Sequence, residues 1–413
     1  MSGLRRRARA AASGLDPEGT AFLLLISGIM TVSAMTTDIN LPALPEIARR
    51  LEAPIERAQL TVTLFFAGFA FGQLFVGPLS DRFGRRPVLL WGLFAYTFVS
   101  LACALADDME TLLALRTLQG VVAAAGPVLA RAVVRDLFTG SRMARTLSLA
   151  TAAFILAPIV APSLGALLLL LGSFRFVFLF LALYGLVLWL ASLRLLGETL
   201  STPDRGALRP ARLLASWTAV FAHPRSRIYG TIAVLNFVVL LVYLTNAPVV
   251  FMQGFGLSPG GFGLVFAVIA MASAAGSLVN ARLLRHFALE RLIALATVTG
   301  AGFCILGLAL LLAGGARLGN LIAVFAGAFF SFSSLMSNAT AAAMQPHGQM
   351  AGAVSSVLGA LQTVIPAAVA SFTALLFDGS ALSTLLTMAL AFAAALALAL
   401  GGARARVPEP GGP

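Results

Sequence analysis

The chain has 413 residues, of which 59% are hydrophobic and 11% are charged. A soluble globular protein has about 25% charged residues, so this composition leaves too little polar surface to coat a globule in water and excludes a soluble protein. The formal net charge of +12 raises the question of a nucleic-acid partner, which the placement of the basic residues along the chain decides.

Apolar segments follow one another along the whole chain, each long enough for the roughly 20 residues that a helix needs to cross the hydrocarbon core. Backbone groups in hydrocarbon must satisfy their own hydrogen bonds, and segments of this length do so as helices rather than as barrel strands. The sequence therefore predicts an all-α membrane protein with twelve transmembrane helices, at residues 21–42, 58–80, 87–106, 111–133, 146–171, 175–194, 228–251, 260–281, 291–313, 318–344, 350–376 and 380–401.

Arginine supplies all of the basic charge, because the chain contains no lysine. If the twelve helices alternate across the membrane with both termini in the cytoplasm, 22 of the 28 arginines fall on the cytoplasmic side and five on the opposite side, with Arg116 inside a span. This bias is the one expected of positive-inside insertion. We therefore predict cytoplasmic termini and no nucleic-acid partner.

The first predicted span carries an acid, Asp38, near its outer end, with Thr37 and Asn40 beside it. Inserting an ionisable side chain into hydrocarbon costs about 2.5 to 3.5 kcal/mol on insertion scales, so such a residue is a candidate for a functional role. Burial favours the neutral acid and a nearby cation favours the anion, so a carboxylate that alternates between such environments can couple proton entry to substrate exit. The alternative is a carboxylate solvated at the outer helix end, because Pro42 and Pro45 follow.

A short charged loop joins the second and third predicted spans, Gly77-Pro78-Leu79-Ser80-Asp81-Arg82-Phe83-Gly84-Arg85-Arg86-Pro87. It resembles the signature between the second and third helices of the major facilitator superfamily of secondary transporters. We predict that Arg85 and Arg86 meet Asp136, which follows the fourth span, and that the pair holds one conformation and releases in another. The residues assigned to this conformational latch are Gly77, Asp81, Arg82, Gly84, Arg85, Arg86 and Asp136.

The fourth predicted span contains an arginine, Arg116, followed by Gln119 and Gly120. An arginine stays charged under all reachable conditions, so it cannot carry the proton, but it can influence a carboxylate or bind a polar group. The alternative is that its side chain extends to the outer interface, near Asp107 and Asp108. The spacing of Arg, Gln and Gly resembles the fourth-helix motif of the same superfamily.

The fifth predicted span contains Pro158 and Pro162, four residues apart, with Gly165 close behind. Each proline removes a backbone donor, so we predict a helix bend here. The drug:proton antiporters of the superfamily have a Gly-Pro-rich motif in this span. Pro162 and Gly165 match it, whereas Ala161 stands where the motif has glycine, which weakens the inference of antiport.

A polar connection between Leu195 and His223 divides the twelve spans into two groups of six. Residues of the first half recur after it. Asn40 and Pro42, at the end of the first span, recur as Asn246 and Pro248 at the end of the seventh, an offset of 206, and Gly72 recurs as Gly276, an offset of 204. The repeat predicts two pseudo-symmetric six-helix bundles. The predicted parts are an N-terminal tail (1–20), a first bundle (21–198), a central cytoplasmic loop (199–225), a second bundle (226–403) and a C-terminal tail (404–413).

The second half has almost no acids within its spans, and its polar residues are amides and hydroxyls. Such groups can bind a substrate, although they also serve as contacts between membrane helices. The predicted substrate cavity combines residues of both halves: Thr37, Asn40, Gln119, Asn246, Asn338 and Gln362. Cys103 and Cys304 are interpreted as packing residues, and no metal or cofactor is expected.

Several segments together resemble the Bcr/CflA subfamily of bacterial multidrug exporters: residues 37–45, the string from Arg116 to Gly120, residues 135–138, the two prolines of the fifth span, and Glu198-Thr199-Leu200. The resemblance implies a twelve-helix inner-membrane antiporter that exports drug-like or metabolite molecules in exchange for protons. We expect it to work as a monomer, in contact with membrane lipids. Asn40 departs from the pattern, because many relatives have an aromatic residue there.

Three other functions remain open. A transporter of the same fold, for export or proton symport, would be specific for one metabolite. A membrane receptor or scaffold is disfavoured because the chain has no sizeable soluble domain to transmit a signal. An enzyme needs a nucleophile, a metal cluster or paired carboxylates, and the predicted spans contain one acid and no histidine.

Overall fold

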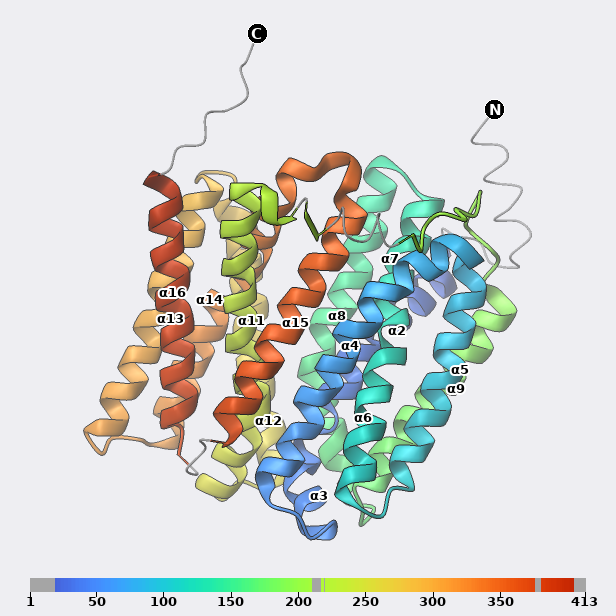
Figure 1. Cartoon of the computed structure of the whole chain (residues 1–413). Coiled ribbons are helices and arrows are strands. Elements are labelled where there is room, and N and C mark those ends of the chain that lie inside the picture. The colour runs from blue at the N-terminus through green and yellow to red at the C-terminus, as the bar shows by residue number, and fades with distance from the viewer. Residues whose placement is uncertain (1–18, 210–216, 219, 376–379, 405–413) are drawn as a thin grey trace. The chain divides into compact units, whose positions relative to one another are not determined.

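The computed structural model describes residues 19–209, 217–218, 220–375 and 380–404, and Figure 1 labels its helices. Within these residues every regular element is a helix, and twelve helical spans are long and apolar enough to cross a membrane. The prediction of an all-α protein with twelve membrane spans is confirmed. Most of both predicted tails, 1–20 and 404–413, and residues 210–216 of the predicted loop lie outside the described residues.

The chain forms two compact units, of which the first comprises Met1–Leu214 with Gly256–Ala267. Its helices are mostly long apolar segments that begin and end near charged or glycine-containing turns. They are α2 (Thr20–Asp38), η1 (Leu41–Ala43), α3 (Leu44–Arg50), α4 (Ile55–Phe83), α5 (Arg85–Ala104), α6 (Met109–Ala123), α7 (Ala125–Leu137), α8 (Gly140–Leu169) and α9 (Arg175–Leu195).

The second unit comprises Ala215–Phe255 and Val268–Pro413. Its helices are α11 (Pro224–Pro248), η2 (Val249–Gly254), α12 (Pro259–Leu283), α13 (Leu289–Leu312), α14 (Leu318–Met344), η3 (Gln345–Met350), α15 (Ala351–Leu375) and α16 (Leu382–Arg404). The first turns of α12 belong to the first unit.

Several predicted spans combine more than one helical element and are longer than the sequence indicated, among them the first and the fourth. The first runs from Thr20 to Arg50, because a 3₁₀ turn with Pro42 and a short helix with Pro45 continue it after α2 ends at Asp38. The fourth runs from Met109 to Leu137 and breaks at Ala124. Proline lacks a backbone donor, so Pro127 cannot continue the hydrogen-bond ladder through this point.

The internal repeat is visible in how two glycines pack. A Cβ at Gly72 of α4 would overlap the carbonyl oxygen of Val121 on α6, and a Cβ at Gly276 of α12 would overlap that of Phe330 on α14. Both glycines allow the backbones of two helices to touch, as small residues do in membrane proteins. The offset of 204 residues thus corresponds to the same helix contact in both units.

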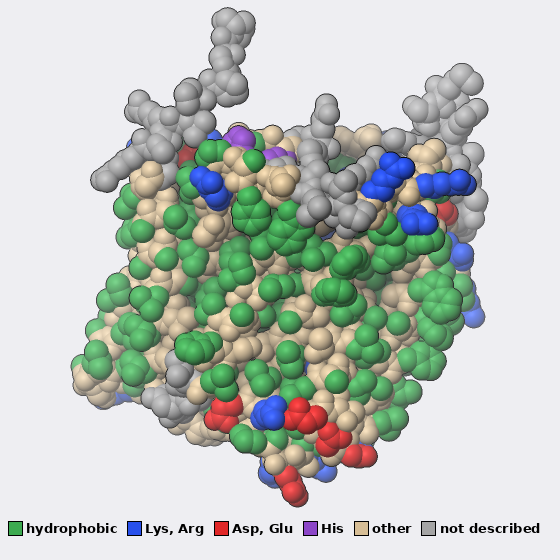
Figure 2. Space-filling model, in the orientation of Figure 1, with side chains coloured by type: hydrophobic (Ala, Val, Ile, Leu, Met, Phe, Trp, Pro, Cys, Tyr) green, Lys and Arg blue, Asp and Glu red, His purple; other side chains and the backbone are tan. Residues whose placement is uncertain are grey.

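Many large apolar side chains are exposed, and we assign the surface that they form to contact with lipid. Trp91 is 71% exposed, Leu170 80% and Leu312 81%, which would be costly for so many large apolar groups in water. Hydrophobic side chains are exposed over much of the face shown in Figure 2. This exposure suits a chain whose solvent is hydrocarbon.

We expect Gly276→Ala to lower the midpoint of thermal unfolding in detergent, because the added methyl group meets backbone that cannot move aside without separating α12 from α14. Overpacking of this kind typically costs about 1 to 3 kcal/mol. The matched control is Gly302→Ala on α13, where nothing lies within 4 Å of an added Cβ. Equal midpoints for the two variants would show that the close helix contact does not limit stability.

Candidate functional site

Asp38 is the last residue of α2 and is only 5% exposed. No group in the described part of the chain forms a hydrogen bond or an ion pair with its carboxylate. A buried carboxylate without a partner is costly when charged, so the neutral acid is favoured in this environment. The alternative, in which water solvates the Asp38 carboxylate at the outer end of the helix, does not fit this burial.

Asn40 lies two residues beyond Asp38 and is fully buried. Neither its amide nitrogen nor its amide oxygen has a partner among the described residues. Buried polar groups in native proteins are nearly always hydrogen-bonded, so this unpaired amide is an exception. The segment from Asp38 to Asn40 therefore concentrates unsatisfied polar groups where α2 ends.

The predicted bend segment of α8 packs against this same segment. A Cβ at Gly165 would overlap the carbonyl oxygen of Ile39 and would lie 3.0 Å from Cγ of Pro42. Glycine at this position therefore lets α8 contact the backbone between Asp38 and Pro42 directly. α8 is one helix that contains both Pro158 and Pro162, and the bend itself stays a prediction.

Arg116 of α6 is fully buried. Its Nε donates to the carbonyl oxygen of Thr61 on α4 at 3.2 Å, and its Nη1 donates to Oε1 of Gln119 at 2.6 Å. The guanidinium carbon lies 4.8 Å from the ring centroid of Phe65 and 5.8 Å from that of Phe178. Cation–π contact and two hydrogen bonds compensate part of the cost of burying this charge.

The charge of Arg116 has no carboxylate partner within the described residues, and its Nη2 is buried without a hydrogen bond. The acids near the start of α6 are engaged elsewhere. Asp107 pairs with Arg175 at 2.5 Å, and Asp108 accepts hydrogen bonds from Thr111, which hold the pKa of this exposed carboxyl below its usual value. Arg116 therefore does not reach the outer interface.

A chain of hydrogen bonds extends from Arg116 toward α2. Nε2 of Gln119 donates to Oγ of Ser100 on α5 at 2.8 Å, and that hydroxyl donates to the carbonyl oxygen of Tyr96 at 2.7 Å. The Tyr96 hydroxyl lies 2.6 Å from Oγ1 of Thr36, two residues before Asp38. Sequence reasoning found Arg116 and Gln119 but missed Ser100, Tyr96 and Thr36, because these residue types also occur as ordinary helix contacts.

Close approach of α4 and α6 makes the Arg116 contacts possible. A Cβ at Gly120 would overlap the carbonyl oxygen of Phe65, and a Cβ at Gly68 would overlap that of Thr117. The two backbones touch here, which brings the carbonyl oxygen of Thr61 within reach of the Arg116 side chain. Gly120, which the sequence placed in a motif with Arg116, thus has a packing role.

Arg85 is the centre of the predicted latch. Its Nη1 lies 2.6 Å from Oδ1 of Asp81 and donates to Oγ of Ser80 at 2.6 Å, while its Nε donates to Oδ2 of Asp136 at 2.9 Å. The Arg85 side chain is 7% exposed. The predicted meeting of Arg85 with Asp136 is present, and it joins the ends of α4, α5 and α7.

Arg86 does not meet Asp136. Its Nε and Nη2 donate to the carbonyl oxygens of Leu196 and Leu193, at 2.7 and 2.8 Å. It lies one residue after Arg85 on the same helix, so its side chain points about 100° away, toward the end of α9. Arg82 is exposed and lies over the ring of Phe83, 5.1 Å from the guanidinium carbon to the ring centroid.

Glu198 also contacts this loop, a role that the sequence did not predict. Its carboxylate accepts from the backbone N–H groups of Arg85 at 3.0 Å and Arg86 at 3.2 Å, so it caps the start of α5. Gly84 has φ of +105°, and a Cβ at this position would overlap Glu198. Unpaired N–H groups at a helix start and the favourable end of the helix dipole explain why an acid belongs here.

The remaining predicted cavity residues are all buried. Oγ1 of Thr37 donates to its own helix at Ser33. In the second unit, the amide of Asn246 donates to Oγ1 of Thr384, Asn338 exchanges two hydrogen bonds with Asn280, and Gln362 lies 3.5 Å from Oγ1 of Thr340. Their role in substrate binding stays a prediction. Among the described residues, no group of three metal-ligating side chains gathers.

Residues 26–371 match the family model described as "Major Facilitator Superfamily". The chain is 30% identical to "Bicyclomycin resistance protein homolog" of Haemophilus influenzae over 89% of this chain and 92% of that protein. It is 31% identical to "Multidrug resistance protein MdtL" of Klebsiella pneumoniae over 83% and 86%. The solved D-xylose-proton symporter aligns with a TM-score of 0.75 at 16% identity, over 92% of this chain and 96% of that one.

We expect Arg85→Gln to lower both the unfolding midpoint and transport, because it leaves Asp81 and Asp136 without a cation. Removing one partner of a partly buried ion pair typically costs about 3 kcal/mol. The matched control is Arg82→Gln, which removes the same charge from the same loop but no ion pair, and should change both little. The network around Arg85 is unimportant if the two variants behave alike.

Proposed function

The chain belongs to the major facilitator superfamily of membrane transporters, and we propose that it is a proton-coupled antiporter that exports drug-like small molecules across the bacterial inner membrane. Its relatives support export, because two of them are named for resistance to bicyclomycin or to multiple drugs. Pro162 and Gly165, which match the antiporter motif of the fifth span, support antiport rather than symport.

One observation carries the proposal: Asp38 is buried at the end of α2 and has no partner in the part of the chain that is described. A carboxylate satisfied by an ion pair would stay charged, whereas this one favours its proton until water or a cation reaches it. We propose that Asp38 takes a proton from outside and releases it inside. Substrate and proton compete for the site.

Arg116 serves this cycle as a fixed positive charge. It cannot release a proton under reachable conditions, so it does not carry one. Its hydrogen-bond chain through Gln119 ends one helix turn or less from Asp38, at Thr36. We propose that this chain holds the polar residues of the first unit in place, and that the free Nη2 receives a polar substrate group or water in one stage of transport.

Alternating access requires a part that holds one state and releases it in another. We propose that residues 1–198 rock against residues 226–413, and that the contacts of Arg85 with Asp81 and Asp136 are made in one state and broken in the other. Gly77, Gly84 and Arg86 support this loop. The arginine distribution supports cytoplasmic termini, and we propose a monomer that works in contact with membrane lipids and protons.

We expect Asp38→Asn to abolish proton-driven export, because the amide has a similar shape but no proton to exchange. The unfolding midpoint should be equal or higher, since no ion pair is lost and the neutral amide can be buried without first taking up a proton. The measurement is recovery of a pH-sensitive dye when bicyclomycin is added to energised inside-out vesicles.

Two controls accompany this test. Glu46→Gln removes an acid from α3 in the same span, which is paired with Arg50 at 2.8 Å, and should leave export intact. Asp38→Glu keeps a titratable group and should retain part of the activity. Full proton-coupled export by a correctly inserted Asp38→Asn variant would disprove the proposed role.

The proposal also predicts a broad substrate range. Cells that express the chain should tolerate raised doses of chemically unrelated compounds, such as bicyclomycin, a fluoroquinolone and a quaternary ammonium dye, and the Asp38→Asn variant should remove the tolerance to all of them. Tolerance confined to one compound would instead favour a transporter specific for a single metabolite.

A further inference from the structure

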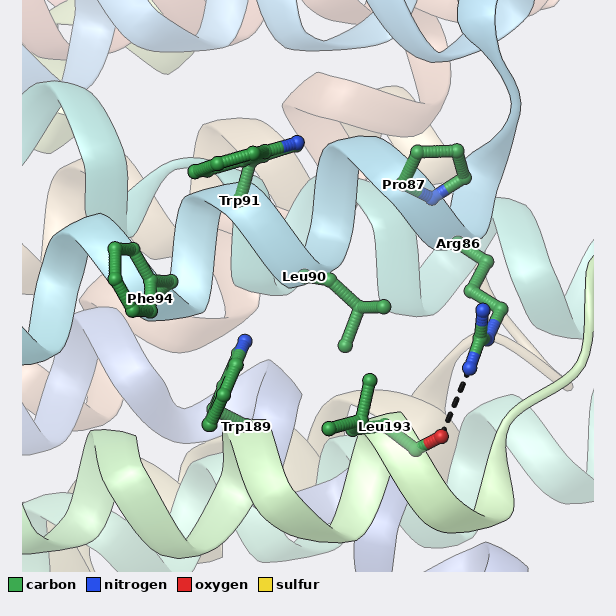
Figure 3. A pocket seen from close by; sticks show the side chains of 7 residues that line it. All are labelled: Arg86, Pro87, Leu90, Trp91, Phe94, Trp189 and Leu193. Atoms are coloured by element: carbon green, nitrogen blue, oxygen red, sulfur yellow. Dashed lines mark hydrogen bonds between the residues drawn. The ribbon is translucent and has the colours of Figure 1, made fainter.

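A groove on the first unit lies outside the transport site and has a volume of about 310 Å³. Two helices form it: α5 contributes Arg86, Pro87, Leu90, Trp91 and Phe94, and α9 contributes Trp189 and Leu193. Figure 3 shows Leu90 and Leu193 pointing toward each other across it, with Arg86 at one end. This volume lies within the range of roughly 300 to 1,000 Å³ that ligand pockets occupy.

The groove is apolar along its length and belongs to the lipid-facing surface. Trp91 is 71% exposed and Leu193 40%. The ring centroids of Phe94 and Trp189, from opposite walls, lie 5.5 Å apart. Between Arg86 and Phe94 the groove runs about 12 Å along α5, from the start of the helix into the hydrocarbon region.

Arg86 supplies the one charged group of the groove. Two of its five N–H donors are used by the carbonyl oxygens of Leu193 and Leu196, which hold the guanidinium across the end of the groove. Within the described residues, no carboxylate lies within ion-pair distance of it. The nearby Glu198 contacts the backbone nitrogen of Arg86, as part of the α5 cap.

We propose that this groove binds an anionic phospholipid of the leaflet on the arginine-rich side. The phosphate accepts hydrogen bonds from the free N–H groups of Arg86, and an acyl chain lies along Leu90 and Leu193 and over the touching rings of Phe94 and Trp189. Arg86 lies where α5 begins, at the level of a lipid headgroup, and the apolar walls run from it toward the membrane interior, where an acyl chain lies. Arginine pairs well with phosphate because its planar fork presents several donors together.

The position of two tryptophans makes the proposal directly measurable. The chain has three tryptophans, of which Trp91 and Trp189 line the groove and Trp217 does not. In a Trp217→Phe background, all indole fluorescence therefore comes from the groove. A lipid with bromine atoms on its acyl chain quenches a tryptophan that it contacts.

The experiment compares brominated phosphatidylglycerol with brominated phosphatidylcholine, at equal mole fractions in vesicles that contain the Trp217→Phe chain. We expect about fivefold preference for phosphatidylglycerol, the effect of one favourable arginine–anionic lipid contact. Arg86→Gln should abolish the preference. Arg82→Gln, which removes the same charge from the same loop outside the groove, should retain it.

A measurement on the otherwise unchanged Trp217→Phe chain keeps the proposal testable if Arg86→Gln does not fold. In 1 M salt the screening length falls to about 3 Å, so the preference should shrink markedly while quenching itself persists. Equal quenching by the two lipids at low salt would overturn the proposal, because the groove would then hold any acyl chain. A preference that survives Arg86→Gln would also overturn it, since another group would recognise the phosphate.

Discussion

The structure depends on one constraint: hydrocarbon does not solvate polar groups, so each polar group inside the membrane must find a partner within the chain or remain costly. Arg116 largely meets this constraint, with the carbonyl of Thr61, the amide of Gln119 and the face of Phe65 around it. Asp38 and Asn40 do not meet it within the described residues. Asp38 and Asn40 lie two residues apart at the end of α2, and this clustering is the reason for placing the proposed proton site there.

Backbone contacts at glycine hold these groups in position. Gly120 brings α6 against α4, which places the Thr61 carbonyl on Arg116, and Gly165 brings α8 against the Ile39 carbonyl beside Asp38. An alanine at either position would meet backbone rather than a movable side chain, so the helices would have to separate. Polar groups are also paired in the charged loop after α4. There Arg85 forms an ion pair with Asp136, and Glu198 accepts a hydrogen bond from a backbone N–H at the start of α5.

Apolar segments bounded by charges, prolines, glycines and turn residues located the twelve spans, because length and apolar composition decide whether a helix crosses a membrane. The sequence also singled out Asp38, Arg116 and the meeting of Arg85 with Asp136, since charges inside or beside apolar segments stand out. It did not show that Arg86 turns toward α9, that Glu198 caps α5, or that Ser100 and Tyr96 continue the Arg116 network. These contacts join residues far apart in the chain, and their residue types are common in helices, so only the fold distinguishes them.

We propose that Asp38 holds a proton that substrate displaces. The decisive experiment adds bicyclomycin to the purified protein in weakly buffered solution and records the pH of the medium, alongside the Asp38→Asn variant. We expect acidification with the unmodified chain and none with the variant. Acidification of equal size in both would rule out Asp38 as the source, because the released proton would then come from another group.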